Sequence, residues 1–359
     1  MDLAEVVLSS GAKSVAIVGT AKNVGKTVTM NYLAQELSSR GLTVGLVSSG
    51  RDGETTDSFT GEPKPSVVPP EGSWVATAEG VLGDAGGLME IADVSEQPGL
   101  LGRLVLGRVV EPAPLELVGP KSVRELADVV AKLKSFGADI VLVDGALDRV
   151  AAASPWVTDV AVLATGAAAD QNLRAIADRA AFVAWLWSRP RLPDPHAREL
   201  ASRALLQGTV AFIEDVPACA GPRYALRLTP YRSCLGYEED IMSKAGSAAA
   251  VVVPGAVSSK FLAEAASWPE REDFSVVAAS PVSVFVDQDP GVAIYVDREI
   301  RLLALTVNPV SYRGISYDPG RIAGAVARRV SEVSGRMLPV FDVVSGEVSG
   351  RGSIGMAMG

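Results

Sequence analysis

The segment SVAIVGTAKNVGKT, Ser14–Thr27, constrains the fold more than any other part of the chain. Its first residues, Ser14–Val18, are an apolar run that predicts a buried strand ending at Gly19. Apolar residues then recur at helical spacing over Gly25–Ser39, and Gly41 follows as a helix stop. The sequence therefore predicts a strand that passes through a glycine-bearing loop directly into a helix.

This loop carries the residue types that bind a polyphosphate. Backbone N–H groups and the dipole at a helix start favour anions, Lys26 is spaced to reach the β- and γ-phosphates, and the Thr27 hydroxyl can ligate Mg²⁺. The spacing departs from the standard loop, because five residues separate Gly19 from Gly25 where four are usual. The alternative is an ordinary glycine turn with an exposed lysine. The predicted nucleotide-binding residues are Gly19, Thr20, Lys22, Asn23, Val24, Gly25, Lys26, Thr27 and Val28, and Lys26 is also a predicted catalytic residue.

A carboxylate partner for the loop is predicted at IVLVDG, Ile140–Gly145. Four apolar residues followed by Asp144 place a carboxylate at the carboxyl edge of a parallel sheet, where open α/β sheets bind ligands. Asp144 is therefore a candidate Mg²⁺ ligand beside Thr27. The alternative is a solvent-exposed aspartate at the end of a strand.

A third candidate element, SSGRDGETTD, Ser48–Asp57, follows the second predicted strand. Asp52 and Glu54 are its candidate catalytic residues, either to position an attacking water or to supply a further Mg²⁺ ligand. A turn built on Asp-Gly needs no function at all, and this alternative stays open.

The order of elements predicts an α/β fold with a mostly parallel sheet and helices on both faces. Strands with continuous Val, Ile and Leu alternate with helices in the first half of the chain. Three prolines in Ser188–His196 suggest a boundary, giving a first domain over 1–190 and an α/β region over 191–359 that either stands alone or extends the same sheet. In that second region, Ala293–Val296 and Arg301–Val307 are predicted to pair as a β-hairpin.

Composition excludes several classes of function. The chain has 359 residues and a formal charge of −9, so it lacks the basic surface of a protein that binds nucleic acid or an anionic membrane. Two cysteines and one histidine cannot build a disulfide framework, a four-thiolate metal site or a histidine-pair catalyst. No uncharged apolar run approaches the roughly 20 residues of a membrane span, and the first residues do not resemble a signal peptide. We therefore expect a cytoplasmic protein.

The loop GTAKNVGKT, Gly19–Thr27, resembles the dethiobiotin synthetase and ParA-like class of P-loop NTPases. The resemblance implies a parallel sheet with Asp144 near the loop, use of Mg²⁺ and a nucleotide, and often a homodimer. Two departures argue against dethiobiotin synthesis. The synthetase carries aspartates where Ala21 and Asn23 stand, and it has a lysine at the end of its second strand, where this chain reads GLVSSG, Gly45–Gly50.

A closer resemblance covers most of the first half of the chain. Together with the loop, the segments Ser48–Pro65, Val143–Pro155 and Thr158–Ala167 look like the small P-loop subunit of a reactivating factor. That factor serves the adenosylcobalamin-dependent lysine and ornithine aminomutases. The resemblance implies two protein partners, a second ATPase subunit and the aminomutase, and an ATP-driven exchange of damaged cobalamin for fresh cofactor. A guanine-reading [NT]KxD motif is missing from the sequence, which favours ATP over GTP.

Three functional hypotheses follow from these patterns. The first is an ATPase that reactivates a partner enzyme. The second is a biosynthetic ligase or kinase of the dethiobiotin synthetase-like branch, which needs basic groups such as Lys64, Lys121 or Arg149 beside the γ-phosphate. The third is a regulator that binds a nucleotide without hydrolysing it. Turnover with a partner, a phosphorylated small-molecule product, or tight binding without turnover would distinguish them.

Overall fold

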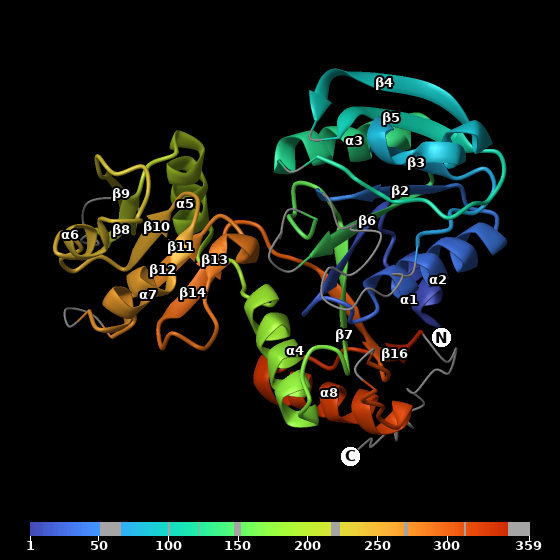
Figure 1. The fold of residues 1–359 in the computed structure, drawn as a ribbon. Coiled ribbons are helices and arrows are strands. Elements are labelled where there is room, and N and C mark those ends of the chain that lie inside the picture. Colours follow the sequence, from blue (N-terminus) through green and yellow to red (C-terminus); the bar gives the residue numbers. More distant parts are fainter. Residues whose placement is uncertain are drawn as a thin grey trace. The chain divides into compact units, whose positions relative to one another are not determined.

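The computed structural model (Figure 1) describes residues 1–50, 66–99, 101–120, 122–146, 152–216, 223–268, 272–311 and 314–343. The chain divides into two compact units. Unit 1 combines Met1–Ala184 with the chain from Arg301 onward, and unit 2 is Trp185–Ile300. None of the helices in the described residues combines the length and the apolar character that a membrane-spanning helix needs.

Unit 1 is built from a large sheet and its covering helices. Its elements are α1 (Leu3–Ser9), β1 (Ser14–Gly19), α2 (Lys26–Ser39), β2 (Val44–Ser48), β3 (Trp74–Ala78), η1 (Glu79–Val81), η2 (Gly83–Leu88), β4 (Met89–Gly99), β5 (Gly102–Val109), α3 (Val123–Ser135), β6 (Ile140–Ala146), β7 (Val160–Gly166), α4 (Leu173–Trp187), β15 (Leu302–Asn308), α8 (Pro319–Ser334) and β16 (Val340–Asp342). The last residues of α4 lie beyond the division between the units.

The sheet of unit 1 has nine strands in the order β16-β15-β7-β1-β6-β2-β3-β5-β4. Strands β16 to β3 in this order run parallel, and β5 is antiparallel to both β3 and β4. Every residue of β1, β2 and β7 is buried, as expected for central parallel strands with continuous apolar sequence. The predicted α/β class with a mostly parallel sheet is confirmed.

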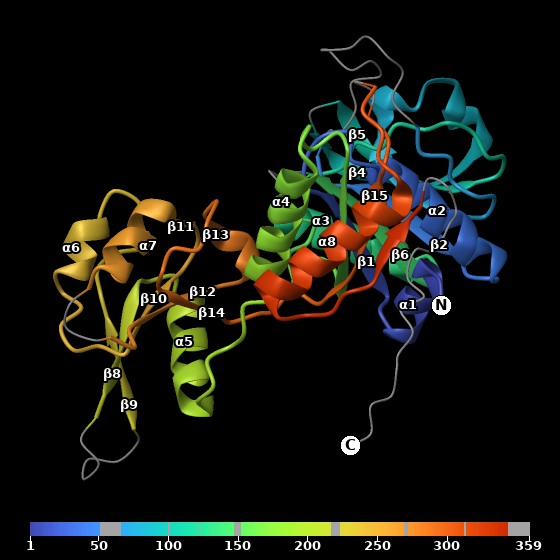
Figure 2. The same ribbon diagram turned by 90° about the horizontal axis from the view of Figure 1, so that it is seen from below.

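Helices cover both faces of this sheet. One continuous core cluster joins α1 and α2 to one face. On the opposite face lies α3, because a Cβ atom at Gly45 of β2 would lie 3.5 Å from the Cβ atom of Leu133 in α3. The helices α4 and α8 lie side by side in both views (Figures 1 and 2), joined by an ion pair between Asp178 and Arg329. The predicted helical layers on both faces are therefore present.

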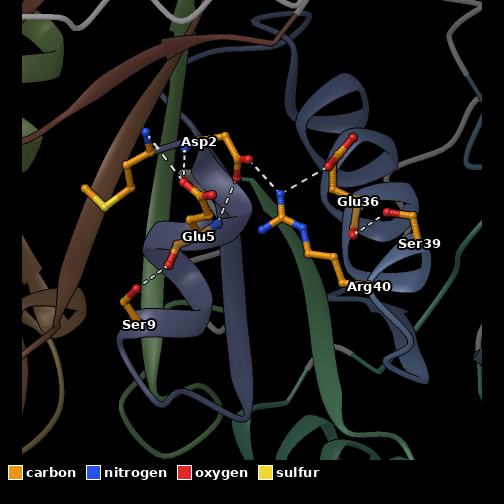
Figure 3. Close-up of polar contacts among 7 residues, drawn as sticks. Asp2, Glu5, Ser9, Glu36, Ser39 and Arg40 are labelled. Carbon is orange, nitrogen blue, oxygen red and sulfur yellow. Dashed lines mark hydrogen bonds and ion pairs between the residues drawn. The ribbon is translucent and has the colours of Figure 1, made fainter.

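A polar network at the N-terminus ties α1 to the end of α2 (Figure 3). The Asp2 carboxylate accepts a hydrogen bond from the Glu5 N–H, and the Glu5 carboxylate accepts one from the Asp2 N–H, both at 2.8 Å. This reciprocal arrangement is a capping box. Arg40, the C-cap of α2, contacts Asp2 at 2.6 Å and Glu36 at 3.3 Å. The network therefore holds α1 against the helix that begins at the candidate loop.

Unit 2 has a smaller mixed sheet in the order β14-β12-β10-β8-β9. Strands β10, β12 and β14 are parallel, whereas β8 is antiparallel to both β9 and β10. Its elements are α5 (Pro195–Gln207), β8 (Ala211–Asp215), β9 (Tyr224–Leu228), α6 (Glu238–Met242), β10 (Ala250–Val253), β11 (Val257–Ser258), α7 (Ser259–Ala266), β12 (Ser275–Ala278), η3 (Pro281–Ser283), β13 (Val284–Phe285) and β14 (Ala293–Val296).

The predicted hairpin between Ala293–Val296 and Arg301–Val307 is wrong, because the two strands belong to different sheets. β14 pairs in parallel with β12 in unit 2, and β15 pairs in parallel with β7 in unit 1. The run LLALTV in β15 is nearly continuous and apolar, which suits a central parallel strand better than one arm of a hairpin. The second half of the chain thus does both things that the sequence left open: part of it forms unit 2, and part extends the first sheet.

The network around Asp2 predicts a pH-dependent stability. Burial, the largest single influence, raises the pKa of Asp2, but the Glu5 N–H and the Arg40 guanidinium together outweigh it and hold the pKa below the ordinary value of 3.8. A carboxyl group with a lowered folded-state pKa stabilises the fold above its unfolded pKa, and this contribution is lost as the pH falls through the folded value. We expect Asp2→Ala to cost about 1 kcal/mol at neutral pH, as for other N-caps.

Thermal melting of wild type, Asp2→Ala and Asp2→Asn across the acidic range checks this expectation. Asparagine keeps the cap acceptor but not the charge, so Asp2→Asn should lose only the part of the stability that depends on the charge of the Asp2 carboxylate. Its difference from wild type should vanish in acid, where the wild-type carboxyl group is protonated. A difference that stays constant with pH would contradict the role given to the Asp2 charge.

Candidate functional site

The loop between β1 and α2 forms a concave backbone at the start of a helix. β1 ends at Gly19 and α2 begins at Lys26. Within the loop, Asn23 has a φ of 59° and Gly25 a φ of 95°, both in the left-handed region. Asparagine and glycine tolerate this conformation best. In a tight loop, residues with left-handed backbone angles orient successive N–H groups toward a common centre. The resulting concavity is suited to bind an anion.

Lys26 packs against Gly19 at the point where β1 ends. A Cβ atom at position 19 would lie 2.8 Å from Cγ of Lys26 and 2.8 Å from Cγ2 of Val24, closer than real atoms approach. Only glycine therefore fits there. Lys26 is 9% exposed, so its aliphatic part runs back over the loop instead of outward into solvent. This course contradicts the alternative of an ordinary turn with an exposed lysine.

The first turn of α2 lacks a side-chain cap. Its N-cap is Gly25, which makes no side-chain hydrogen bond. By contrast, α3, α5, α7 and α8 each begin with a Ser or Asp side chain that accepts a hydrogen bond from a first-turn N–H. Uncapped first-turn N–H groups and the positive end of the helix dipole together favour a bound anion. The start of α2 thus combines an open helix end with a buried lysine.

The neighbouring strands bring Asp144 and two hydroxyl groups to the same edge of the sheet. Asp144 of β6 aligns with Ile17 of β1 on one side and with Ser48 of β2 on the other. The side chain of Asp144 is almost fully buried, with 7% of the residue exposed, so it is not the exposed strand-end aspartate of the alternative interpretation. Ser48 and Ser49 are buried too, and their hydroxyl groups have no hydrogen-bond partner among the described residues.

The other flank of the loop is formed by β7 and β15. The Thr20 hydroxyl donates to the Thr165 hydroxyl at 3.0 Å, and the Thr20 N–H donates to the Ala164 carbonyl at 2.8 Å. Asn308 lies at the end of β15, with its Cβ atom 3.1 Å from where a Cβ atom of Gly25 would stand. Sequence reasoning missed Asn308, because its strand was assigned to a hairpin. The sequence did carry a signal for Asn308. A continuous apolar run favours a parallel strand, and a polar residue at the end of such a strand lies at the carboxyl edge of the sheet.

The structure brings most of the predicted residues together. Gly19, Thr20, Val24, Gly25 and Lys26 form the loop and its buried contacts, Thr27 is half-buried in the first turn of α2, and Asp144 lies on the adjacent strand. Two predicted residues behave differently: Lys22 is exposed, and the Val28 side chain packs against the hydrophobic core. Asp52 and Glu54 lie outside the described residues, as do Lys64, Lys121 and Arg149.

The donor set suits a magnesium ion shared with a phosphate ligand. Among the described residues there is no group of three or more His, Cys, Asp or Glu side chains that could hold a metal ion. Mg²⁺ typically takes one or two carboxylates from the protein and fills its remaining positions with water and substrate phosphates. A single buried carboxylate with adjacent hydroxyls at the edge of the sheet fits that pattern.

Comparisons of the chain with family models, with curated proteins and with solved structures found no match.

The contact between Gly19 and Lys26 predicts the effect of a one-methyl substitution. Gly19→Ala forces either Lys26 or Val24 to move, because the new Cβ atom would overlap both side chains. If the loop binds Mg·ATP, as the sequence predicts, the affinity of the variant for Mg·ATP should fall at least tenfold, a change of about 1.4 kcal/mol. Isothermal titration of the variant with a non-hydrolysable ATP analogue and Mg²⁺ measures it.

Gly87→Ala is the matched control, because a Cβ atom at Gly87 would meet nothing within 4 Å. This control should bind the analogue as the wild type does. Wild-type affinity in Gly19→Ala would show that the position of Lys26 against the loop does not matter for binding.

Proposed function

We propose that this chain binds Mg·ATP at the loop between β1 and α2 and hydrolyses it. The observation that carries the proposal is the course of Lys26, which runs back across Gly19 into a loop whose helix start has no side-chain cap. A lysine whose aliphatic chain is buried against such a loop is suited to bind phosphate oxygens. The protein is then a P-loop NTPase acting in the cytoplasm.

Each residue at the sheet edge has a role in this proposal. Backbone N–H groups from Thr20 to Thr27 hold the β-phosphate, and Lys26 neutralises the charge that develops on the β- and γ-phosphates. Thr27 and Asp144 hold Mg²⁺, which when bound neutralises part of the negative charge on the phosphate oxygens. Water attacks the γ-phosphorus in line with the leaving oxygen. Asp52 and Glu54 remain candidates to position that water.

Lys26→Ala tests the hydrolysis step. Loss of the amine should lower ATP turnover at least 100-fold, which corresponds to about 2.7 kcal/mol of barrier. Phosphate release in the presence of Mg²⁺ measures it. Lys13→Ala is the control, because Lys13 is exposed and lies at the opposite end of β1 from the loop. Wild-type turnover in Lys26→Ala would exclude the proposed mechanism.

We further propose that hydrolysis serves a partner enzyme, an adenosylcobalamin-dependent aminomutase that the chain reactivates together with a second ATPase subunit. The support is the resemblance of four segments to the small subunit of such a factor: the loop, Ser48–Pro65, Val143–Pro155 and Thr158–Ala167. The ligase or kinase alternative is less well supported. At the end of β2 it would need a cation beside the acceptor, and this chain places the neutral Ser48 and Ser49 there.

Recovery of an inactivated aminomutase tests the partner proposal. The assay contains the aminomutase inactivated by damaged cobalamin, fresh adenosylcobalamin, ATP, the second subunit and either wild type or Lys26→Ala. We expect the aminomutase activity to recover in the assay with the wild-type chain and not in the assay with Lys26→Ala. If both fail although every component is folded, the reactivation proposal is wrong, and a phosphorylated small-molecule product becomes the expected outcome.

A further inference from the structure

The Ser48 hydroxyl at the end of β2 is buried without a partner. Ser48 is 0% exposed, and its Oγ atom has no hydrogen-bond partner among the described residues. The buried threonine hydroxyls around the loop differ in this respect: Thr20 bonds Thr165, and Thr29 bonds both Thr306 and the Gly25 carbonyl. A buried hydroxyl that makes no hydrogen bond costs free energy, and a ligand bound at this edge of the sheet would give the Ser48 hydroxyl a partner.

The sheet register places Ser48 and Asp144 next to each other on the same face. Successive side chains of a strand alternate between faces, and Leu46 of β2 and Leu142 of β6 both belong to the core cluster under α2. Ser48 comes two residues after Leu46, and Asp144 comes two residues after Leu142. Both side chains therefore lie on the same face of the sheet as these leucines, nearer to the start of α2. They are also direct register partners on adjacent strands, which lie about 4.8 Å apart.

Ser49 provides an internal comparison on the opposite face. Its Oγ atom lies 3.5 Å from where a Cβ atom of Gly145 would stand, and Gly145 follows Asp144 on β6. Its N–H donates to the Asp144 carbonyl at 2.8 Å, so the backbone of Ser49 is fixed in the same ladder. Ser48 and Ser49 are thus adjacent in the sequence and both buried, but only Ser48 lies on the α2 face of the sheet with Asp144.

We propose that Ser48 is a positioning residue of the magnesium site, and that its hydroxyl orients a metal-bound water beside Asp144. This inference rests on the proposed Mg·ATP function. A serine hydroxyl both donates and accepts, so it can bond a metal-bound water on one side and the Asp144 carboxylate or a phosphate oxygen on the other. Outer partners of this kind hold the metal's direct ligands in place, and their loss typically weakens metal binding about 10- to 100-fold.

The test measures metal affinity and stability separately. The apparent Kd of Mn²⁺, a substitute for Mg²⁺, is determined for the full chain with a saturating non-hydrolysable ATP analogue, from the electron paramagnetic resonance signal of free Mn²⁺. We expect Ser48→Ala to raise this Kd at least tenfold and Ser49→Ala to leave it within twofold of wild type. Without nucleotide or metal, Ser48→Ala should melt at the wild-type temperature or above it, because it removes a hydroxyl that has no partner in the described structure.

Each outcome supports or overturns the inference. Wild-type Mn²⁺ affinity in Ser48→Ala, with the analogue still bound, overturns the role of Ser48 alone. A lowered melting temperature of Ser48→Ala without ligands also overturns it, because the hydroxyl would then be structural. If the wild-type chain itself binds no Mn²⁺ with the analogue, the proposed function fails and the inference fails with it.

Discussion

The close packing of Lys26 against Gly19 is the contact on which the candidate site depends. It requires a glycine at the end of β1. It also requires a helix that begins with a lysine seven residues after that glycine, so that the lysine chain folds back over the strand end. Because β1 lies between β6 and β7 in the sheet, that strand end is held on both sides. The loop can then present its N–H groups without support from a side-chain cap.

The parallel register carries this local arrangement across the sheet. Asp144 and Ser48 lie at the same sheet edge as the loop only because β6 and β2 run parallel to β1, so that all three strands end there. On the other flank, Thr306 and Asn308 of β15 contact the first turn of α2 and its N-cap glycine. The site is thus assembled from segments at both ends of the chain, with unit 2 inserted between them in sequence.

Features with a local physical signal were predictable from the sequence. The strand, loop and helix over Ser14–Ser39 follow from apolar patterning and glycine placement. The strand β15 was predicted, but its pairing in a hairpin is wrong. Its nearly continuous apolar run favours a central parallel strand, whereas the strands with which it pairs are distant partners that no local pattern specifies. Asn308 was missed for that reason, and the role inferred for Ser48 required its register with Asp144.

Hydrogen–deuterium exchange of the full chain, with and without a non-hydrolysable ATP analogue and Mg²⁺, tests the central claim most directly. If the loop cradles the phosphates, the amides from Thr20 to Val28 become protected when the ligand is added, and the protection is lost when Mg²⁺ and the analogue are removed. Ligand binding that leaves these amides unchanged, or that protects only peptides of unit 2, would contradict the account.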